Sequence, residues 1–233
     1  MSSDPRPQPF SGIAPQSFRV NDSVERPMNL PGDPMLNDPR MAEDEKEEKD
    51  GGDAGMMKRM LKTRSILVFE PISDKLARRV QNTLLLMQQD DEKSPITVYI
   101  NSPGGSADSG FAIYDSLRFF KPPVRTVVNG LCASAAVMVY LAAPKERRTS
   151  LPNSRFLLHQ PSTAAYGTAS DIEINAEEIV KLRARYNEIV GKECGKTLDQ
   201  VTKDADRDFW MSPEEAHKYG LVGKVIKSYG ELG

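Results

Sequence analysis

The segment Val127–Tyr140 reads VVNGLCASAAVMVY and joins two runs of different character. The β-branched residues Val124–Val128 are typical of a buried strand, and Asn129-Gly130 predicts a turn that ends this strand. The small and apolar residues that follow recur at helical spacing. The segment therefore predicts a strand, a turn and a helix, with Ser134 near the start of the helix.

The hydroxyl of Ser134 is the polar group of this apolar run. A serine just after a strand-to-helix turn lies beside backbone N–H groups that stabilise negative charge, as an acyl-transfer nucleophile requires. A serine in an alanine-rich helix is also a common packing residue. The serine alone therefore leaves both interpretations open.

Histidine is scarce, because the chain has only two. His159 follows a strand-like apolar run, whereas His217 lies in a charged segment that we expect to be exposed. A strand-end histidine with Ser134 as its partner favours catalysis over packing. An acid would then orient the imidazole, but acids are plentiful and spacing alone does not choose one. Asp208 is suggestive because it precedes the apolar run Phe209–Met211, and Asp204 lies one turn earlier.

Strands and helices alternate in the first part of the folded chain. Apolar and β-branched runs predict strands at 65–69, 96–100 and 124–128, and helical spacing predicts a helix capped by Ser73 and another over 106–120. Such alternation indicates βαβ units with right-handed crossovers and a largely parallel sheet, which is the α/β class.

The loop Asn101–Gly105, NSPGG, links the second predicted strand to its helix. Two glycines at the carboxyl end of a strand let the backbone approach a ligand, at the edge where α/β sheets bind ligands. Ser134 follows the next strand, so we expect both loops on the same edge. An ordinary turn is the alternative, and the Lys-Ser/Thr ending of a phosphate loop is missing.

After His159, Ser170 and Glu173 predict a capping box that opens a long helix to about Val190. We expect a helix this long and charged to project from the domain, so its apolar stripe needs a partner such as another subunit. Similar boxes, Thr197 with Gln200 and Ser212 with Glu215, predict two further helices. The apolar positions of the long helix are Ile172, Ile174, Ile179, Leu182 and Tyr186.

Composition limits the class of protein. The 39% apolar and 27% charged residues fit a globular domain, and a net charge of −2 gives no sign of nucleic-acid binding. The uncharged stretch Leu131–Ala143 is too short to span a membrane and no secretory signal opens the chain, so we expect a cytoplasmic protein. We expect Cys132 to be buried, Cys194 to be a surface thiol, and neither a metal nor a cofactor to be bound.

Residues 1–55 differ from the rest. Eight of the 17 prolines lie in the first 40 residues, and the charged run MAEDEKEEKDGGDAG follows. Too few apolar residues are present to offset the entropy of ordering. We therefore predict a disordered extension over 1–55 and one folded domain over 56–233.

The domain from about Met56 to Ser228 resembles the ClpP family, the proteolytic subunits of the Clp proteases. The resemblance implies a ClpP/crotonase-like fold of repeated ββα/βαβ units, with a protruding handle formed by the Tyr166-Gly167 loop and the helix after it. The matching blocks are INSPGG (Ile100–Gly105), the Ala-Ser of CASAAV, LPNSRFLLHQP (Leu151–Pro161), DIEINAEEI (Asp171–Ile179) and DADRDFWMSPEEAHKYGLV (Asp204–Val222).

The resemblance also implies roles for single residues. Ser134 is the expected nucleophile, His159 the general base and Asp208 its orienting acid. The backbone N–H groups of Gly105 and Ala135 are the expected oxyanion hole.

The implied activity is that of an ATP-dependent serine endopeptidase subunit, which cuts unfolded polypeptides to short peptides through an acyl-enzyme. Such subunits form two stacked seven-membered rings, fed by an AAA+ unfoldase of the ClpX, ClpA or ClpC type that uses the ATP. Asp206 and Arg207 match positions at which the family forms ion pairs between rings.

The chain departs from the family pattern at three places. Ala135-Ala136 replaces the usual Met-Gly after the serine, the N-terminal pore hairpin has no clear counterpart, and polar Ser106, Asp108 and Ser109 follow the glycine pair. A second hypothesis is therefore a weakly active or structural subunit in mixed rings with a paralogue. A third is a crotonase-type enzyme that acts on acyl-thioesters with the oxyanion loops alone.

Overall fold

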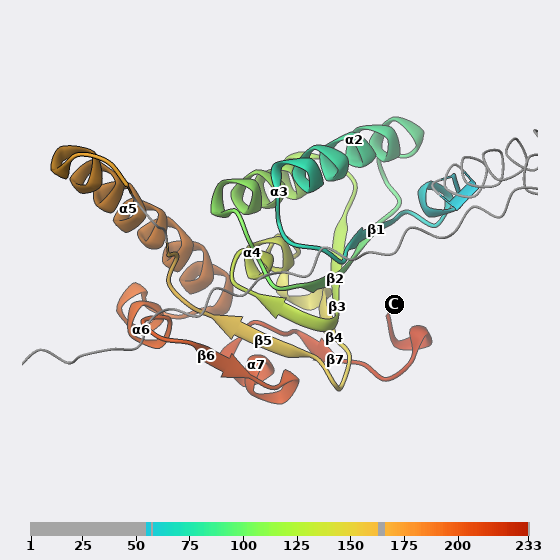
Figure 1. Cartoon of the computed structure of the whole chain (residues 1–233). Helices are drawn as coiled ribbons and strands as arrows, with labels where there is room; N and C mark the ends of the chain where they lie inside the picture. Colours follow the sequence, from blue (N-terminus) through green and yellow to red (C-terminus); the bar gives the residue numbers. More distant parts are fainter. Residues whose placement is uncertain (1–54, 57, 163–165, 233) are drawn as a thin grey trace, which may run out of the picture. The chain divides into compact units, whose positions relative to one another are not determined.

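The computed structural model describes residues 55–56, 58–162 and 166–232 (Figure 1). Apart from Gly55, the predicted extension over 1–55 lies outside these ranges. The elements, in chain order, are β1 (Ser65–Val68), α2 (Asp74–Asp90), β2 (Ile96–Ser102), α3 (Ala107–Phe119), β3 (Val124–Ala133), α4 (Ala135–Leu141), η1 (Lys145–Arg147), β4 (Arg148–Ser150), β5 (Arg155–Leu158), α5 (Ala169–Cys194), α6 (Leu198–Asp204), β6 (Phe209–Met211), α7 (Pro213–Tyr219), β7 (Lys224–Val225) and η2 (Tyr229–Glu231).

The strands of the described part form one sheet, whose main path runs β1-β2-β3-β4-β7 with every neighbouring pair parallel. A branch leaves this path at β3, because β5 pairs in parallel with the end of β3 and β6 pairs antiparallel with β5. The predicted α/β class with a largely parallel sheet is therefore confirmed. The alternation β1-α2-β2-α3-β3 follows the predicted order.

The helices α2, α3 and α4 lie together on one side of the main path (Figure 1). Ser73 caps α2 by accepting the N–H of Leu76, and Ser106 caps α3 in the same way. The buried stripe of α2 follows the helical period and packs into the core, as the sequence predicts. Its members are Leu76, Val80, Leu84 and Met87.

The strand β3 corrects one prediction, because it continues through Asn129-Gly130 to Ala133 instead of ending in a turn there. A bulge at this place shifts the register, so that Ile100 pairs with Val128 but Ser102 pairs with Cys132. The side chain of Asn101 fills the gap: its Oδ1 accepts the N–H of Leu131 at 3.0 Å. Gly130, at φ 114°, has no room for a Cβ beside that oxygen. The Asn-Gly pair thus serves a bulge, which also needs positive φ.

The long helix α5 begins earlier than predicted. The capping box is formed by Thr168 and Asp171, not by Ser170 and Glu173. Thr168 follows Gly167, which has φ 147°, and the helix starts at Ala169. The helix ends at Cys194, which is 7% exposed, so the prediction of a surface thiol was wrong. No helix in the described ranges, α5 included, combines the length and the apolar character that crossing a membrane requires.

The two shorter predicted boxes differ in outcome. Ser212 and Glu215 form a reciprocal box at the start of α7, as predicted. Thr197 caps α6 by accepting the N–H of Gln200, but the Gln200 side chain donates to Asp204 instead of returning to the cap. Only half of that box is therefore made.

Candidate active site

Ser134 lies at the junction of β3 and α4, which is the position that the sequence predicts. Its φ of 54° and ψ of −125° are rare for a residue other than glycine. Two bonds hold this conformation: its N–H donates to the carbonyl oxygen of Leu157 in β5 at 3.0 Å, and its carbonyl accepts the N–H of Val137 at 2.9 Å. A strained backbone that neighbouring elements fix in place is typical of functional sites.

The glycine loop lies directly against the backbone of this serine. A Cβ on Gly104, which has φ 87°, would be 2.6 Å from the carbonyl oxygen of Ala133 and 2.7 Å from the Cβ of Ser134. The loop is anchored by Ile72, whose N–H donates to Gly104 at 2.8 Å and whose carbonyl accepts from Ser106 at 2.9 Å. The two strand-edge loops therefore meet, as the sequence predicts.

His159 follows β5, and Asp208 directly precedes β6. The antiparallel pairing of Leu158 with Phe209 sets the two residues side by side. His159 Nδ1 lies 3.3 Å from Asp208 Oδ1, and the two side chains are 33% and 62% exposed. When Nδ1 carries the proton it donates to the carboxylate, and Nε2 is left to accept a proton.

Asp204, the other acid left open by the sequence, has different partners. Its carboxylate accepts from the hydroxyl of Tyr219 at 3.1 Å and from Nε2 of Gln200 at 2.8 Å. The structure therefore brings Asp208, and not Asp204, to His159.

Gln160 is a residue of this region that the sequence did not single out. Its N–H donates to the carbonyl of Ala205 and its side-chain Nε2 to the carbonyl of Asp206, both at 2.8 Å. Its Oε1 accepts from Arg183 of α5 at 3.0 Å. Gln160 thus connects the end of β5, the loop before Asp208 and α5. Its only sequence signal is its place next to His159.

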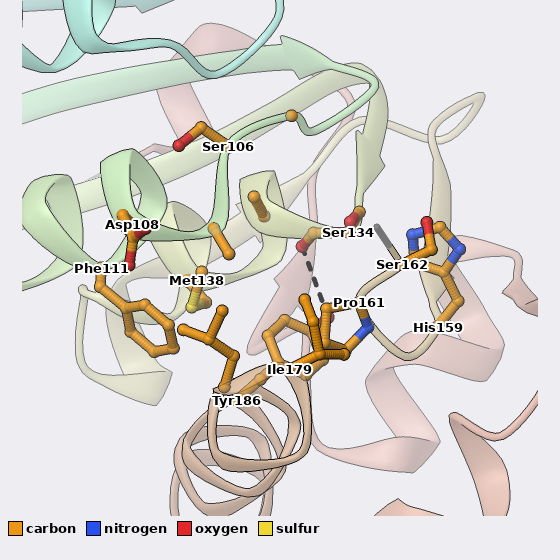
Figure 2. A pocket seen from close by; sticks show the side chains of 14 residues that line it. Ser106, Asp108, Phe111, Ser134, Met138, His159, Pro161, Ser162, Ile179 and Tyr186 are labelled. Carbon is orange, nitrogen blue, oxygen red and sulfur yellow. Dashed lines mark hydrogen bonds between the residues drawn. The ribbon is translucent and has the colours of Figure 1, made fainter. Parts of the chain in front are cut away.

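Ser134 and His159 line one pocket of about 260 Å³ (Figure 2). In the described structure no hydrogen bond joins the Ser134 hydroxyl to His159, so only the contact between His159 and Asp208 is formed. Hydrogen bonds of catalytic groups often tighten only when substrate binds. The remaining walls come mainly from α3, α4 and α5, with Asp108, Phe111, Met138, Ile179, Leu182 and Tyr186.

The backbone N–H groups of Gly105 and Ala135 find no acceptor among the described residues. Both residues line the same pocket as Ser134. The nitrogen of Ala135 would lie 3.0 Å from a Cβ on Gly104, so the two donor-bearing segments are in contact. Two available N–H groups beside a hydroxyl form an arrangement that can stabilise an oxyanion.

His217, the other histidine, is exposed on α7 as predicted, and its Nδ1 lies 2.9 Å from the carbonyl oxygen of Val222. It is not among the residues that line the pocket. Across residues 55–162 and 166–232, as far as they are described, no three His, Cys, Asp or Glu side chains are grouped as ligands for a metal ion.

The chain is similar to known proteins over most of its length. A family model described as Clp protease matches residues 48–229. The ATP-dependent Clp protease proteolytic subunit 2 of Treponema denticola is 44% identical over 189 residues, which cover 81% of this chain and 94% of that protein. The proteolytic subunit 3 of Rhizobium johnstonii is 46% identical over 173 residues, which cover 74% of this chain and 89% of that protein.

A comparison with solved structures points to the same family. A mutant of ClpP1 from Listeria monocytogenes matches with a TM-score of 0.71 and 40% identity, over 76% of this chain and 99% of that one. The resemblance that the sequence blocks indicate is thereby confirmed, together with the ClpP-like fold. Agreement of the family model, the relatives and the fold leads to one conclusion: this chain belongs to the Clp protease family, a family of serine peptidases.

Proposed function

We propose that this chain is the serine endopeptidase subunit of an ATP-dependent protease, which cuts unfolded polypeptides through an acyl-enzyme on Ser134. One observation carries the proposal. His159 lines the same pocket as Ser134, and its other face is 3.3 Å from the carboxylate of Asp208. A hydroxyl, an imidazole and a carboxylate in this order are the parts of an acyl-transfer site.

In the proposed acylation step, Oγ of Ser134 attacks the carbonyl carbon of the scissile peptide bond while Nε2 of His159 takes the Oγ proton. Asp208 stabilises the imidazolium that forms. The carbonyl oxygen becomes an oxyanion, which accepts hydrogen bonds from the backbone N–H groups of Gly105 and Ala135. His159 then returns the proton to the leaving amine as the C–N bond breaks.

Deacylation repeats these roles with water. His159 takes a proton from the water as the oxygen attacks the ester carbon, and the same two N–H groups bind the second oxyanion. Breaking the ester bond returns the proton to Oγ of Ser134 and releases the peptide with a new carboxyl end.

We propose that the working form is two stacked seven-membered rings, fed with unfolded polypeptide by an AAA+ unfoldase. Two features support this. The first ten residues of α5, Ala169–Glu178, are all exposed in the single chain. Asp206 and Arg207 are also solvent-facing, at 60% and 93% side-chain exposure, and approach each other only at 4.0 Å, so both charges can be reached by groups of a second ring.

The test compares the two histidines. Hydrolysis of a fluorogenic peptide by the purified chain is expected to fall by about 10⁶-fold in Ser134→Ala and in His159→Ala, and sedimentation should show unchanged assembly. His217→Ala is the matched control and should keep wild-type activity. A fluorophosphonate should label wild-type Ser134 only. Assembled wild-type rings without label and without Ser134-dependent hydrolysis would refute the proposal.

The acid is tested in the same way with Asp208→Asn and Asp204→Asn. Loss of the carboxylate beside His159 should lower kcat by about 10⁴-fold. Asp204→Asn keeps an oxygen that can accept from Tyr219, so its activity should stay near that of the wild type. Equal losses in both variants would exclude Asp208 as the orienting acid.

A second candidate function is a weakly active or structural subunit that assembles with a paralogue. The numbered names of the similar proteins, proteolytic subunits 2 and 3, favour it, as does Ala135-Ala136 after the serine. Recovery of the chain only in mixed rings, whose hydrolysis survives Ser134→Ala in this subunit, would select this function over the first.

A further inference from the structure

Tyr186 of α5 reaches the backbone of the candidate nucleophile. Its side chain is 5% exposed and lines the pocket together with Met138 and Leu182. Its hydroxyl donates to the carbonyl oxygen of Ser134 at 3.4 Å (Figure 2). The sequence indicated Tyr186 only as an apolar position of a long helix, so this contact adds a role that periodicity does not reveal.

The contact matters because of the peptide unit to which that carbonyl belongs. The carbonyl of Ser134 and the N–H of Ala135 are parts of one planar group and point in opposite directions. Two donors fix the carbonyl, the N–H of Val137 at 2.9 Å and the hydroxyl of Tyr186 at 3.4 Å. Fixing the oxygen therefore fixes the direction of the Ala135 N–H. Hydrogen bonds to the oxygen also polarise the peptide and strengthen its donor.

The peptide unit needs such support. Ser134 has φ 54° and ψ −125°, which lies outside the wells that residues with a side chain normally occupy. Rotation of the Ser134–Ala135 peptide about its flanking bonds would change this ψ and relieve the strain. The same rotation would turn the N–H of Ala135 away from the pocket and bring the carbonyl toward it. A strained conformation persists only when its surroundings hold it.

The phenol can supply this bond throughout the working pH range. Burial raises the pKa of Tyr186 above its usual 10.0. The hydroxyl therefore keeps its proton and remains a donor.

We propose that Tyr186 is a positioning residue, which holds the Ser134–Ala135 peptide so that the N–H of Ala135 faces the pocket as an oxyanion donor. The inference rests on the proposed function, and adds to it a side chain of α5 that supports the oxyanion site from behind. Tyr186 does not touch the reacting atoms. Its effect should therefore appear where negative charge forms on the substrate oxygen, and not in the binding of the uncleaved peptide.

The test is Tyr186→Phe, which removes the hydroxyl and keeps the ring in the pocket wall. We expect kcat for a fluorogenic peptide to fall by roughly 3- to 10-fold, the effect of one hydrogen bond, with KM within about twofold of the wild type. A peptide aldehyde, whose adduct with Ser134 carries an oxyanion, should bind more weakly by a similar factor. The affinity for an uncleavable peptide should not change.

Tyr114→Phe is the matched control. Tyr114 is also buried, and its hydroxyl bonds to α5, at Glu193 Oε1 over 3.2 Å, but it does not line the pocket. This variant should keep wild-type kcat. A fall in kcat shared by both variants, or a rise in KM with kcat and aldehyde affinity unchanged in Tyr186→Phe, would overturn the inference in favour of a packing role.

Failure of the inference and failure of the proposed function give different results. Wild-type hydrolysis that depends on Ser134 and is kept in Tyr186→Phe removes the inference alone. Absence of Ser134-dependent hydrolysis in the wild type removes the proposed function. Crystals of Tyr186→Phe then still decide the structural point: a rotated or doubly placed Ser134–Ala135 peptide supports the role of Tyr186, and an unchanged peptide contradicts it.

Discussion

At the scale of single residues, the candidate site depends on the contact between Gly104 and the Ser134 backbone. Substituting Gly104→Ala places a methyl group 2.6 Å from the carbonyl oxygen of Ala133 and forces a residue with a side chain to φ 87°. We expect a loss of about 2–4 kcal/mol in the free energy of unfolding and the loss of peptide hydrolysis. Denaturant unfolding and a fluorogenic assay measure the two effects.

Gly195→Ala is the control for Gly104→Ala. Gly195 also has a positive φ, 68°, but a Cβ there meets nothing within 4 Å. The free energy of unfolding should fall by only about 1–2 kcal/mol, the cost of a positive φ for a residue with a Cβ, and peptide hydrolysis should be unchanged. Equal effects of the two substitutions would mean that strain, and not the close approach to Ser134, decides the outcome at Gly104.

Asp108 places a carboxylate on the pocket wall, beside apolar groups such as Phe111. The other polar residues after the glycine pair have internal roles: Ser106 caps α3, and Ser109 donates to Asp74 at 2.5 Å. We expect Asp108 to favour substrates with a cationic side chain near the cleaved bond. Asp108→Asn should lower kcat/KM for a lysine-containing peptide by about fivefold relative to a leucine-containing one, as expected for a pair of unit charges about 4 Å apart in water.

Asp115→Asn controls for the change in net charge. Asp115 is exposed on the same helix, but it is not part of the pocket wall. The lysine-to-leucine ratio should be unchanged in this variant, and high salt should weaken the preference of the wild type. A ratio that Asp108→Asn leaves unaltered would show that the carboxylate does not face the bound side chain.

At the scale of elements, the sequence predicts those whose signals are local. The stripe Leu76, Val80, Leu84, Met87 and the cap Ser73 define α2 without help from the rest of the chain. The course of β3 was not predictable in this way. Asn129-Gly130 has the signature of a turn, and only the side chain of Asn101, from the neighbouring strand, makes it a bulge.

In the candidate site, too, some features follow from local sequence signals and others only from tertiary contacts. Ser134 and His159 lie close together because β3 and β5 are parallel neighbours, and each residue follows the end of its strand. The sequence predicts this part, because the strand ends and the alternation of strands and helices are local signals. The choice between Asp204 and Asp208 depends on the pairing of β5 with β6. The contact of Tyr186 with Ser134 depends on the packing of α5. These are tertiary contacts between distant segments, and no local spacing encodes them.

The last turn of α5 carries a testable consequence of burial. Burial raises the pKa of the Cys194 thiol from its ordinary 9.0 to about 11. The folded state therefore holds this proton more tightly than the unfolded state. The contribution of the neutral thiol to stability is full below pH 9 and is lost as the pH rises through about 11.

We expect the free energy of unfolding of Cys194→Ala to fall less between pH 9 and pH 11 than that of the wild type, since Cys132 and the tyrosines are common to both chains. Ellman's reagent at neutral pH should react with Cys194 only after denaturant is added. Reaction of the native thiol at the rate of a free cysteine would contradict its burial.

At the scale of the whole molecule, the single chain leaves an apolar face of α5 uncovered. Apolar side chains are exposed along the first part of α5, with Ile172, Ile174 and Val180 at 44%, 60% and 59%. A helix stripe of this kind is stable in water when another surface covers it. The proposed contact between rings would do so.

Ile174→Asp should therefore separate assembly from folding. We expect smaller particles in sedimentation, an unchanged helical circular dichroism spectrum, and lower peptidase activity in proportion to the lost assembly. Asn175→Asp adds the same charge at the next position of the same exposed turn and should leave particle size closer to the wild type. Particles of wild-type size from Ile174→Asp would show that this face of α5 does not carry the contact.

The two halves of β3 have different neighbouring strands. Thr126–Val128 are enclosed between β2 and β4, whereas Leu131–Ala133 also support β5, which leads to His159. The bulge between these halves uncouples their ladders. In deuterium exchange, the amides of Leu131–Ala133 can therefore exchange at a different rate from those of Thr126–Val128, so that local opening beside β5 is detected while the main path of the sheet stays protected.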